Sequence, residues 1–414
     1  MEKKIWFRGW PRSTGGEEIV MGRTLRRGGR SLRASSNILL LAAGCMAFLV
    51  SARPAAAWWY RTQGTDSSSL FRNEARALAE DPAGDIVAAG SVGNVADAGD
   101  FVVVKLVRVT GSELWRWERS GTAPGLDTAY SVAIDGSGDV LAAGTFENSA
   151  TNADFAVVKL DGATGTELWR REIDGSANTD EEAAAVVVDA SGDVVVAGTL
   201  SSPATQDDFA VVKLDGTTGA ELWRVLLDGS AAAGNDAAYD VALDAGGNVF
   251  AVGRLKQSSS DADFAVVKLA GETGAELWRR EIDGLADSGS DGALRVAVDP
   301  AGDVIAAGNL YSPSSLDDLA VIKFAGATGG ELWRYVSYEP NENPGETATA
   351  LAIDAGGHVV VGAFLPPVIG VDPWEYSSES TSEVVKIDGG SGAMLWRQYL
   401  GERYSFEPVP DVAV

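Results

Sequence analysis

The sequence predicts an all-β fold, a β-propeller of four-stranded antiparallel blades. The tripeptide Leu-Trp-Arg recurs six times, and successive tryptophans lie 54, 54, 55, 55 and 63 residues apart. Each period contains four short β-like segments separated by glycine-containing turns, and a fixed period of this length marks one unit of a repeat protein. A parallel β-helix would need a shorter period, and paired helices would need a 3.6-residue apolar periodicity. The six tryptophans are Trp115, Trp169, Trp223, Trp278, Trp333 and Trp396.

One period, residues 183–224, shows the four expected strands in order. Strand A is the apolar segment 183–190 (AAAVVVDA), and strand B, 194–198 (VVVAG), follows a Ser-Gly-Asp turn. A polar loop leads to strand C, 208–214 (DFAVVKL), and an Asp-Gly-Thr-Thr-Gly turn leads to strand D, 221–224 (ELWR). Continuous apolar runs, as in strands A and B, are typical of strands that are covered on both faces.

Counting these periods predicts six complete blades and part of a seventh. Residues 58–64 (WWYRTQG) align with strand D, and residues 411–414 (DVAV) align with strand A. A seventh blade would join these two segments and close the ring, but its strands B and C are missing. A seven-bladed design is the preferred prediction, and a six-bladed closure with two spare strands is the alternative.

Two short motifs resemble known propeller repeats. The segment 161–169, Asp-Gly-Ala-Thr-Gly-Thr-Glu-Leu-Trp, resembles the tryptophan-docking repeat of PQQ-type propellers. Asp-Phe-Ala-Val-Val-Lys, with the later Val-Asp-x-x-Gly-Asp-Val, resembles the bacterial SBBP propeller repeat. The Thr-Gly-x-Glu-Leu-Trp core is intact in five copies and decays to Ser-Gly-Ala-Met-Leu-Trp in the last. The resemblance covers residues 58–414 and implies the fold much more specifically than a function.

The repeated tryptophans and lysines are interpreted as structural residues. A flat indole in each blade fills the widening space between neighbouring blades, and its N–H needs an acceptor across that gap. A lysine lies in the middle of strand C in every copy, and a half-buried ammonium needs a carboxylate partner. The aspartate that precedes strand C is the expected partner. The lysines are Lys105, Lys159, Lys213, Lys268, Lys323 and Lys386.

Residues 1–57 are predicted to be an export signal, which leaves 58–414 as the propeller domain. A basic stretch precedes an apolar run from Ile38 to Val50 and an Ala-Ala-Ala site, the pattern of a secretory signal peptide that is too short for a membrane span. Residues 1–20 fit no part of such a signal, so Met21 is a possible true start. The alternative is a bacterial lipobox, Leu-Ala-Ala-Gly-Cys, with a lipid anchor at Cys45. The expected location is extracellular or periplasmic.

Composition excludes several function classes. Cys45 is the single cysteine and His358 the single histidine, so thiolate zinc sites and histidine metal clusters are excluded. His358 stands where other copies carry Asp or Asn and is interpreted as a turn residue. Residues 58–414 hold 23 basic and 56 acidic residues, and a balance of −33 repels nucleic acids and anionic lipids.

The candidate ligand-binding residues lie in two long, non-repeating loops. Turns A–B and C–D would lie on one face of the propeller, and loops B–C and D–A on the other, where insertions usually mark a binding face. Drift in the last blade is the competing explanation. Pairs such as Asp135 and Asp139 look like a calcium loop, but tight turns need the same residues. The candidates are Glu339, Asn341, Glu342, Asp372, Trp374 and Tyr376.

The favoured function is a non-catalytic, secreted or envelope-associated propeller that binds a protein or glycan on its long-loop face. No catalytic residue, cofactor or metal site is predicted. The PQQ resemblance implies one alternative, a quinoprotein dehydrogenase, although the site residues and vicinal disulfide of such enzymes have no counterpart here. A second alternative is an outer-membrane assembly scaffold, which would require lipidation of Cys45.

Overall fold

The computed structural model describes residues 73–93, 99–177, 179–231, 234–257, 261–284, 289–313, 316–337, 345–365 and 381–400. Every regular element in these ranges is a β-strand. No helix among them is long and apolar enough to cross a membrane. All of these residues belong to one compact unit.

The strands form six sheets, which we number as blades 1 to 6. Blade 1 contains β1 (Glu74–Glu80), β2 (Ile86–Val92), β3 (Asp100–Leu106) and β4 (Glu113–Arg119). Blade 2 contains β5 (Thr128–Ile134), β6 (Val140–Asn148), β7 (Asn152–Leu160) and β8 (Glu167–Ile173). Blade 3 contains β9 (Glu182–Val188), β10 (Val194–Ser202), β11 (Gln206–Leu214) and β12 (Glu221–Leu227), with the short β13 (Gly234–Asn235) beside β11.

Blade 4 contains β14 (Ala237–Leu243), β15 (Val249–Lys256), β16 (Ala262–Leu269) and β17 (Glu276–Ile282). Blade 5 contains β18 (Gly292–Val298), β19 (Val304–Ser312), β20 (Leu316–Phe324) and β21 (Glu331–Val336). Blade 6 contains β22 (Thr347–Ile353), β23 (Val359–Leu365), β24 (Thr381–Ile387) and β25 (Met394–Leu400).

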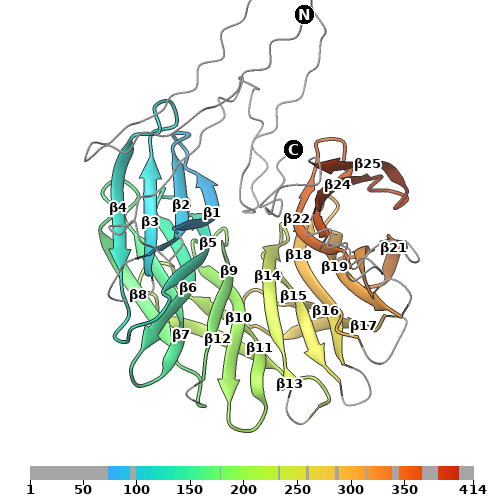
Figure 1. Cartoon of the computed structure of the whole chain (residues 1–414), viewed down its shortest axis with the longest axis horizontal. Coiled ribbons are helices and arrows are strands. Elements are labelled where there is room, and N and C mark those ends of the chain that lie inside the picture. The colour runs from blue at the N-terminus through green and yellow to red at the C-terminus, as the bar shows by residue number, and fades with distance from the viewer. Residues whose placement is uncertain are drawn as a thin grey trace, which may run out of the picture. The chain divides into compact units, whose positions relative to one another are not determined.

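Each blade is an antiparallel meander in chain order, which confirms the predicted fold class (Figure 1). In blade 3 the central strand β10 pairs Val194 with Val188 of β9 and with Leu214 of β11. Strands B and C are buried along most of their length because both sheet faces are covered. Strand D is the exposed outer strand of each sheet. The predicted order A, B, C, D is therefore the observed order in all six blades.

The hydrophobic core lies between the sheets. The first strands of successive blades pack in series, β1 on β5, β5 on β9, β9 on β14, β14 on β18 and β18 on β22. One core cluster joins Val195 and Phe209 of blade 3 to Val249 and Val267 of blade 4. Blades 1 and 6 are not joined by packing of that extent among the described strands. Residues 58–64 and 411–414, predicted to form a seventh blade, lie outside the described residues, as does the segment 1–57.

The meander sorts its connections onto two opposite ends of each sheet. We call one end the turn face, made by the A–B turns such as 135–139 and the C–D turns such as 161–165. We call the other end the loop face, made by the B–C and D–A connections. The two segments predicted to bind ligand follow β21 and β23, whose C-terminal ends lie on this face.

Candidate functional site

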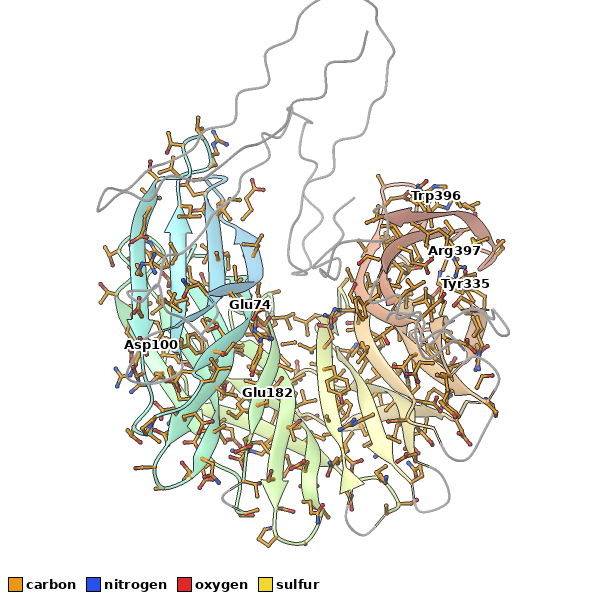
Figure 2. All side chains as sticks on the ribbon, in the orientation of Figure 1. Glu74, Asp100, Glu182, Tyr335, Trp396 and Arg397 are labelled. Atoms are coloured by element: carbon orange, nitrogen blue, oxygen red, sulfur yellow. The ribbon has the colours of Figure 1, made fainter. Side chains whose placement is uncertain are left out.

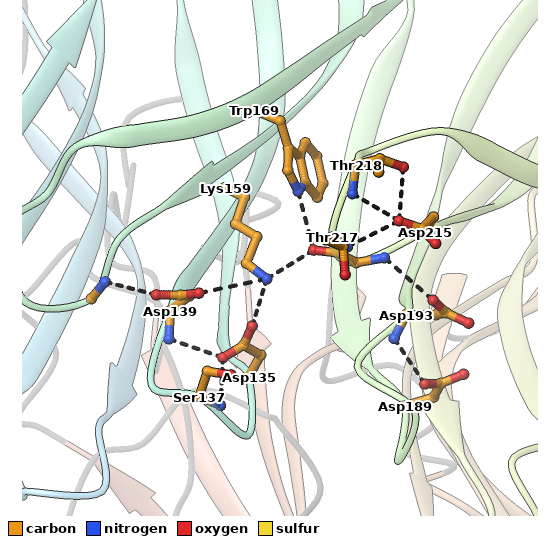
Figure 3. Close-up of polar contacts among 12 residues, drawn as sticks. Asp135, Ser137, Asp139, Lys159, Trp169, Asp189, Asp193, Asp215, Thr217 and Thr218 are labelled. Atoms are coloured by element: carbon orange, nitrogen blue, oxygen red, sulfur yellow. Dashed lines mark hydrogen bonds and ion pairs between the residues drawn. The ribbon is translucent and has the colours of Figure 1, made fainter.

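On the turn face, a tryptophan and a lysine join each blade to the next. Lys159 of strand C is the direct cross-strand partner of Trp169 of strand D, so both side chains leave the same side of the sheet. The Trp169 Nε1–H donates to the Gly216 carbonyl of blade 3 at 3.1 Å, and Lys159 Nζ donates to the same oxygen at 2.8 Å (Figure 3). The same two bonds recur at the other described junctions, with Gly162, Gly271, Gly326 and Gly389 as acceptors.

The glycine of the Thr-Gly motif leaves the space in which the indole packs. Gly219 has φ of +68°, a backbone conformation that L side chains rarely adopt, and an added Cβ would lie 2.8 Å from the Trp169 ring. The ring of one blade therefore packs flat on the C–D turn of the next. Trp396 of blade 6 is 46% exposed, whereas Trp333 of blade 5 is 8% exposed (Figure 2).

The partner predicted for the lysines was wrong. Lys159 Nζ forms an ion pair with Asp135 Oδ2 at 2.7 Å, in the A–B turn, and not with Asp154, which precedes strand C. Asp154 lies five residues earlier, about 17 Å along an extended strand. Asp135 lies at the same end of the sheet as Lys159 because strand A is antiparallel to strand B. All six lysines pair with the corresponding turn aspartate.

The same aspartates also accept hydrogen bonds within the A–B turns that contain them. Asp135 Oδ1 accepts the backbone N–H groups of Ser137 and Asp139 at 2.8 and 2.9 Å, while Oδ2 faces the lysine. Both oxygens are therefore engaged by protein donors. His358 lies in the equivalent turn of blade 6, where its backbone N–H donates to Asp354 at 2.9 Å.

On the loop face, an acidic residue lies directly before strand A in each of blades 2 to 6. In blades 2 to 5 its oxygens face backbone amides at the loop-face ends of the strands, as when Asp127 accepts from Gly121 and Glu147 at 2.7 and 2.6 Å. In blade 6, Glu346 accepts from Ser337 Oγ. Sequence reasoning missed these buried groups, although their recurrence before strand A was visible. The residues are Asp127, Glu181, Asp236, Asp291 and Glu346.

Burial changes the protonation of three of these carboxyls. Burial raises the pKa of Asp236 and Asp291 to about 6, although backbone N–H groups act in the opposite direction. Burial, with the charges of Asp174 and Asp154, raises the pKa of Glu181 to about 8. None of the three forms an ion pair with a lysine or arginine of the described residues. The loop face thus holds buried acids that lack cationic partners.

A polar pocket of about 240 Å³ opens on the loop face of blade 4. Arg254 and Lys256 lie near the end of β15, where blade 3 has Thr199 and Ser201. Arg254 Nε donates to the Asn235 carbonyl at 3.0 Å. Lys256 forms an ion pair with Asp261, which also lines the pocket. The departure from the repeat was visible in the sequence but was not singled out. The lining residues are Asn235, Arg254, Lys256, Asp261, Ala262 and Ser290.

The six candidate ligand residues chosen from the sequence lie outside the described residues. Glu339, Asn341 and Glu342 fall in 338–344, and Asp372, Trp374 and Tyr376 fall in 366–380. Their role stays a prediction.

The chain was compared with known proteins. The sequence model of a family described as outer membrane protein assembly factor BamB matches residues 55–206 and 207–373. No curated protein sequence matches the chain. The SBBP likeness has no support from this comparison.

Solved structures with the same fold share little sequence with this chain. Quinohemoprotein alcohol dehydrogenase from Comamonas testosteroni matches with a TM-score of 0.50 and 12% identity, over 79% of this chain and 61% of that one. The alcohol dehydrogenase ADHIIG from Pseudomonas putida HK5 gives 0.51 and 12%, over 77% and 59%. BamB from Moraxella catarrhalis gives 0.40 and 16%, over 78% and 87%. The chain therefore spans about three fifths of each dehydrogenase.

Proposed function

Because the chain belongs to the PQQ-like propeller family described as outer membrane protein assembly factor BamB, we propose that it is a non-catalytic binding propeller. Its ligand is a protein or glycan, and it binds on the loop face. The observation that carries this proposal is the blade 4 pocket, where the repeat is broken by two basic residues. Repeat proteins keep structural positions alike and vary the positions that meet a ligand.

The charge of the pocket indicates which part of a ligand it would hold. Arg254 and Lys256 are two basic residues in a pocket whose described lining holds one acidic residue, Asp261, on a chain with a net charge of −26. The planar guanidinium of arginine presents paired donors that match a carboxylate. The pocket would therefore hold an acidic side chain of a protein, or the carboxylate of an acidic sugar. The two predicted long loops, on the same face, would extend this contact.

We further propose that the protein is exported through its residues 1–57 and works outside the cytoplasm. The family name refers to assembly of outer membrane proteins, and a scaffold role of that kind is compatible with a binding propeller. Lipidation of Cys45 would attach such a scaffold to a membrane, whereas cleavage after Ala57 would release it.

The pocket does not suit the quinone cofactor of the dehydrogenases that share the fold. PQQ is a planar group that needs a flat apolar or aromatic surface, and no aromatic ring lines the pocket. We therefore derive no redox step for this chain.

The test compares two double variants. Arg254→Thr with Lys256→Ser gives blade 4 the residues of blade 3, and Arg224→Thr with Arg279→Ser removes the same charge from the outer strands β12 and β17. Partners are cross-linked in envelope extracts, purified and titrated directly, and acidic glycans are screened on an array. The pocket variant should weaken binding by about tenfold or more, as expected for loss of a central arginine. Equal binding by both variants would contradict the proposal, as would turnover of alcohols by the wild type supplied with PQQ and calcium.

A further inference from the structure

We propose that a hard divalent cation, with calcium as the best candidate, binds between Asp154, Asp174 and Glu181 at the junction of blades 2 and 3. This site is separate from the blade 4 pocket and does not depend on the proposed function. It differs also from the turn aspartates, which resemble a calcium loop in sequence but are occupied by lysines and backbone amides.

Three different elements bring the carboxylates together. Asp154 lies near the start of β7, Asp174 follows the end of β8, and Glu181 precedes β9. One oxygen from each residue lies within 4.8 Å of the other two. Asp154 and Glu181 are 5% and 1% exposed, while Asp174 is exposed and gives the group an opening to solvent. A cation could enter past Asp174 and be held by the two buried residues.

The buried oxygens are not satisfied by the protein. Neither oxygen of Glu181 has a hydrogen bond of acceptable geometry, although the carboxyl faces the amides of Gly175 and Ser201. Asp154 Oδ2 accepts from Asn148 Nδ2 at 2.8 Å, whereas Oδ1 has no partner. Buried polar atoms are almost always paired, because an unpaired one loses its hydration without compensation. Two of the three clustered carboxylates therefore hold buried oxygens without a partner, which indicates a missing positive partner.

At other junctions, hydrogen-bond donors of the protein satisfy the equivalent acidic residues. The position of Asp174 is a serine in blade 1, where Ser120 Oγ donates to Asp100 at 2.6 Å. In blade 5 a serine lies one position earlier, and Ser337 Oγ donates to Glu346. In blade 2 the hydroxyl donor is replaced by a third acceptor. At the junction of blades 4 and 5, Asp291 accepts backbone N–H groups of Gly284 and Tyr311, so its oxygens are satisfied.

The surroundings are negative as well. Burial, and then the charges of Asp180 and Asp154, raise the pKa of Glu147 on β6. Burial and the neighbouring Asp174 and Asp154 raise the pKa of Glu181 to about 8.

The donor set selects the class of metal. All three residues offer carboxylate oxygens, which suit calcium and magnesium rather than zinc or copper. Calcium accepts six to eight oxygens in flexible geometry, so carboxylates with water can complete its shell, whereas magnesium demands a near-octahedral site. Residues from three separate elements make a flexible set, which favours calcium.

The experiment measures calcium binding to the full-length protein after treatment with a chelator. Equilibrium dialysis with radioactive calcium at pH 7 should show one equivalent bound with a dissociation constant of about 10⁻⁴ M or tighter. Asp174→Ser, which copies blade 1, should weaken this binding by about 100-fold. Asp283→Ser makes the same change in the equivalent group of Asp263, Asp283 and Asp291 at the junction of blades 4 and 5. Because Asp291 is satisfied by backbone N–H groups there, this variant should leave the binding unchanged.

Circular dichroism in chelator must show that the Asp174→Ser variant is folded, and a Glu181→Gln variant serves if it is not. The inference is overturned if the wild type binds no calcium at about 1 mM, or if both site variants bind calcium as the wild type does.

Discussion

The turn face and the loop face both contain buried acidic residues, but these residues have opposite kinds of partner on the two faces. On the turn face, each aspartate of an A–B turn is paired with a lysine of strand C and with its own turn amides. On the loop face, Glu181, Asp236 and Asp291 are buried without a cation. The difference shows that burial alone does not determine the protonation of a carboxyl, since the partner decides it.

The two faces also differ in how strictly they repeat. The Lys–Asp pair occurs in all six blades, and the Trp–Gly bond occurs at all five described junctions. The loop face changes from blade to blade, with Arg254 in blade 4 and with Ser120 in blade 1 at the position that Asp174 holds in blade 2. We infer that the turn face holds the blades together and that the loop face is where binding properties are set.

The largest expected effect is loss of an inter-blade tryptophan. Trp333→Ala removes a ring that is 8% exposed together with its bond to Gly389, and should lower the free energy of unfolding by about 3–5 kcal/mol. Trp396→Ala, at a ring that is 46% exposed, should cost less than about 1 kcal/mol. Denaturant unfolding measures both. Equal losses would show that the ring's packing between blades is not what stabilises the junction.

Loss of a turn-face lysine should have the next largest effect. Lys213→Met keeps the apolar stem but leaves Asp189 without its cation, and should cost about 3 kcal/mol. Lys386→Met, where the side chain is 23% exposed, should cost clearly less. Chemical denaturation of the two variants in parallel tests the ranking, and a larger loss for Lys386 would contradict it.

The pH dependence of stability should separate the two faces. Burial raises the pKa of Asp81 and Asp244, but hydrogen bonds, among them those to Lys105 and Lys268, outweigh it and hold the pKa below 3.8. Their stabilisation is complete above that value and is lost as the pH falls below it. Glu181, with its pKa raised from 4.5 to about 8, binds more protons when folded, so stability declines as the pH rises through that window.

Thermal unfolding in chelator across this range should therefore show a maximum and then a decline toward pH 8. Glu181→Gln cannot titrate and should flatten the alkaline decline while leaving the acid limb unchanged. An alkaline limb that is identical in the variant would mean that Glu181 does not titrate as described.

The smallest stability effect is expected for the blade 4 pocket. Arg254→Thr with Lys256→Ser changes partly exposed side chains and should alter the free energy of unfolding by no more than about 0.5 kcal/mol. A large loss in urea unfolding would show that the pair supports the fold, and would remove it as a binding candidate.

The fold could be predicted because the same four-strand pattern recurs in six copies of the repeat. In residues 183–224 the expected strands match β9 to β12 with small shifts at the ends. The lysine partner could not be predicted from proximity, because Asp154 is close to Lys159 in sequence and Asp135 is close in space. Glu181 lies outside the expected strand A, and its burial depends on three separate elements. Glu339 and Trp374 lie outside the described residues and keep the status of predictions.

The central claim is that the loop face, rather than the turn face, meets the ligand. A photo-crosslinking residue placed at Ser290, which lines the blade 4 pocket, and another placed at Thr217, in a C–D turn, test it in one experiment. Both positions are exposed, so neither substitution should unfold the protein. The account predicts that Ser290 crosslinks to a partner and that Thr217 does not. Crosslinking from Thr217 with none from Ser290 would contradict it.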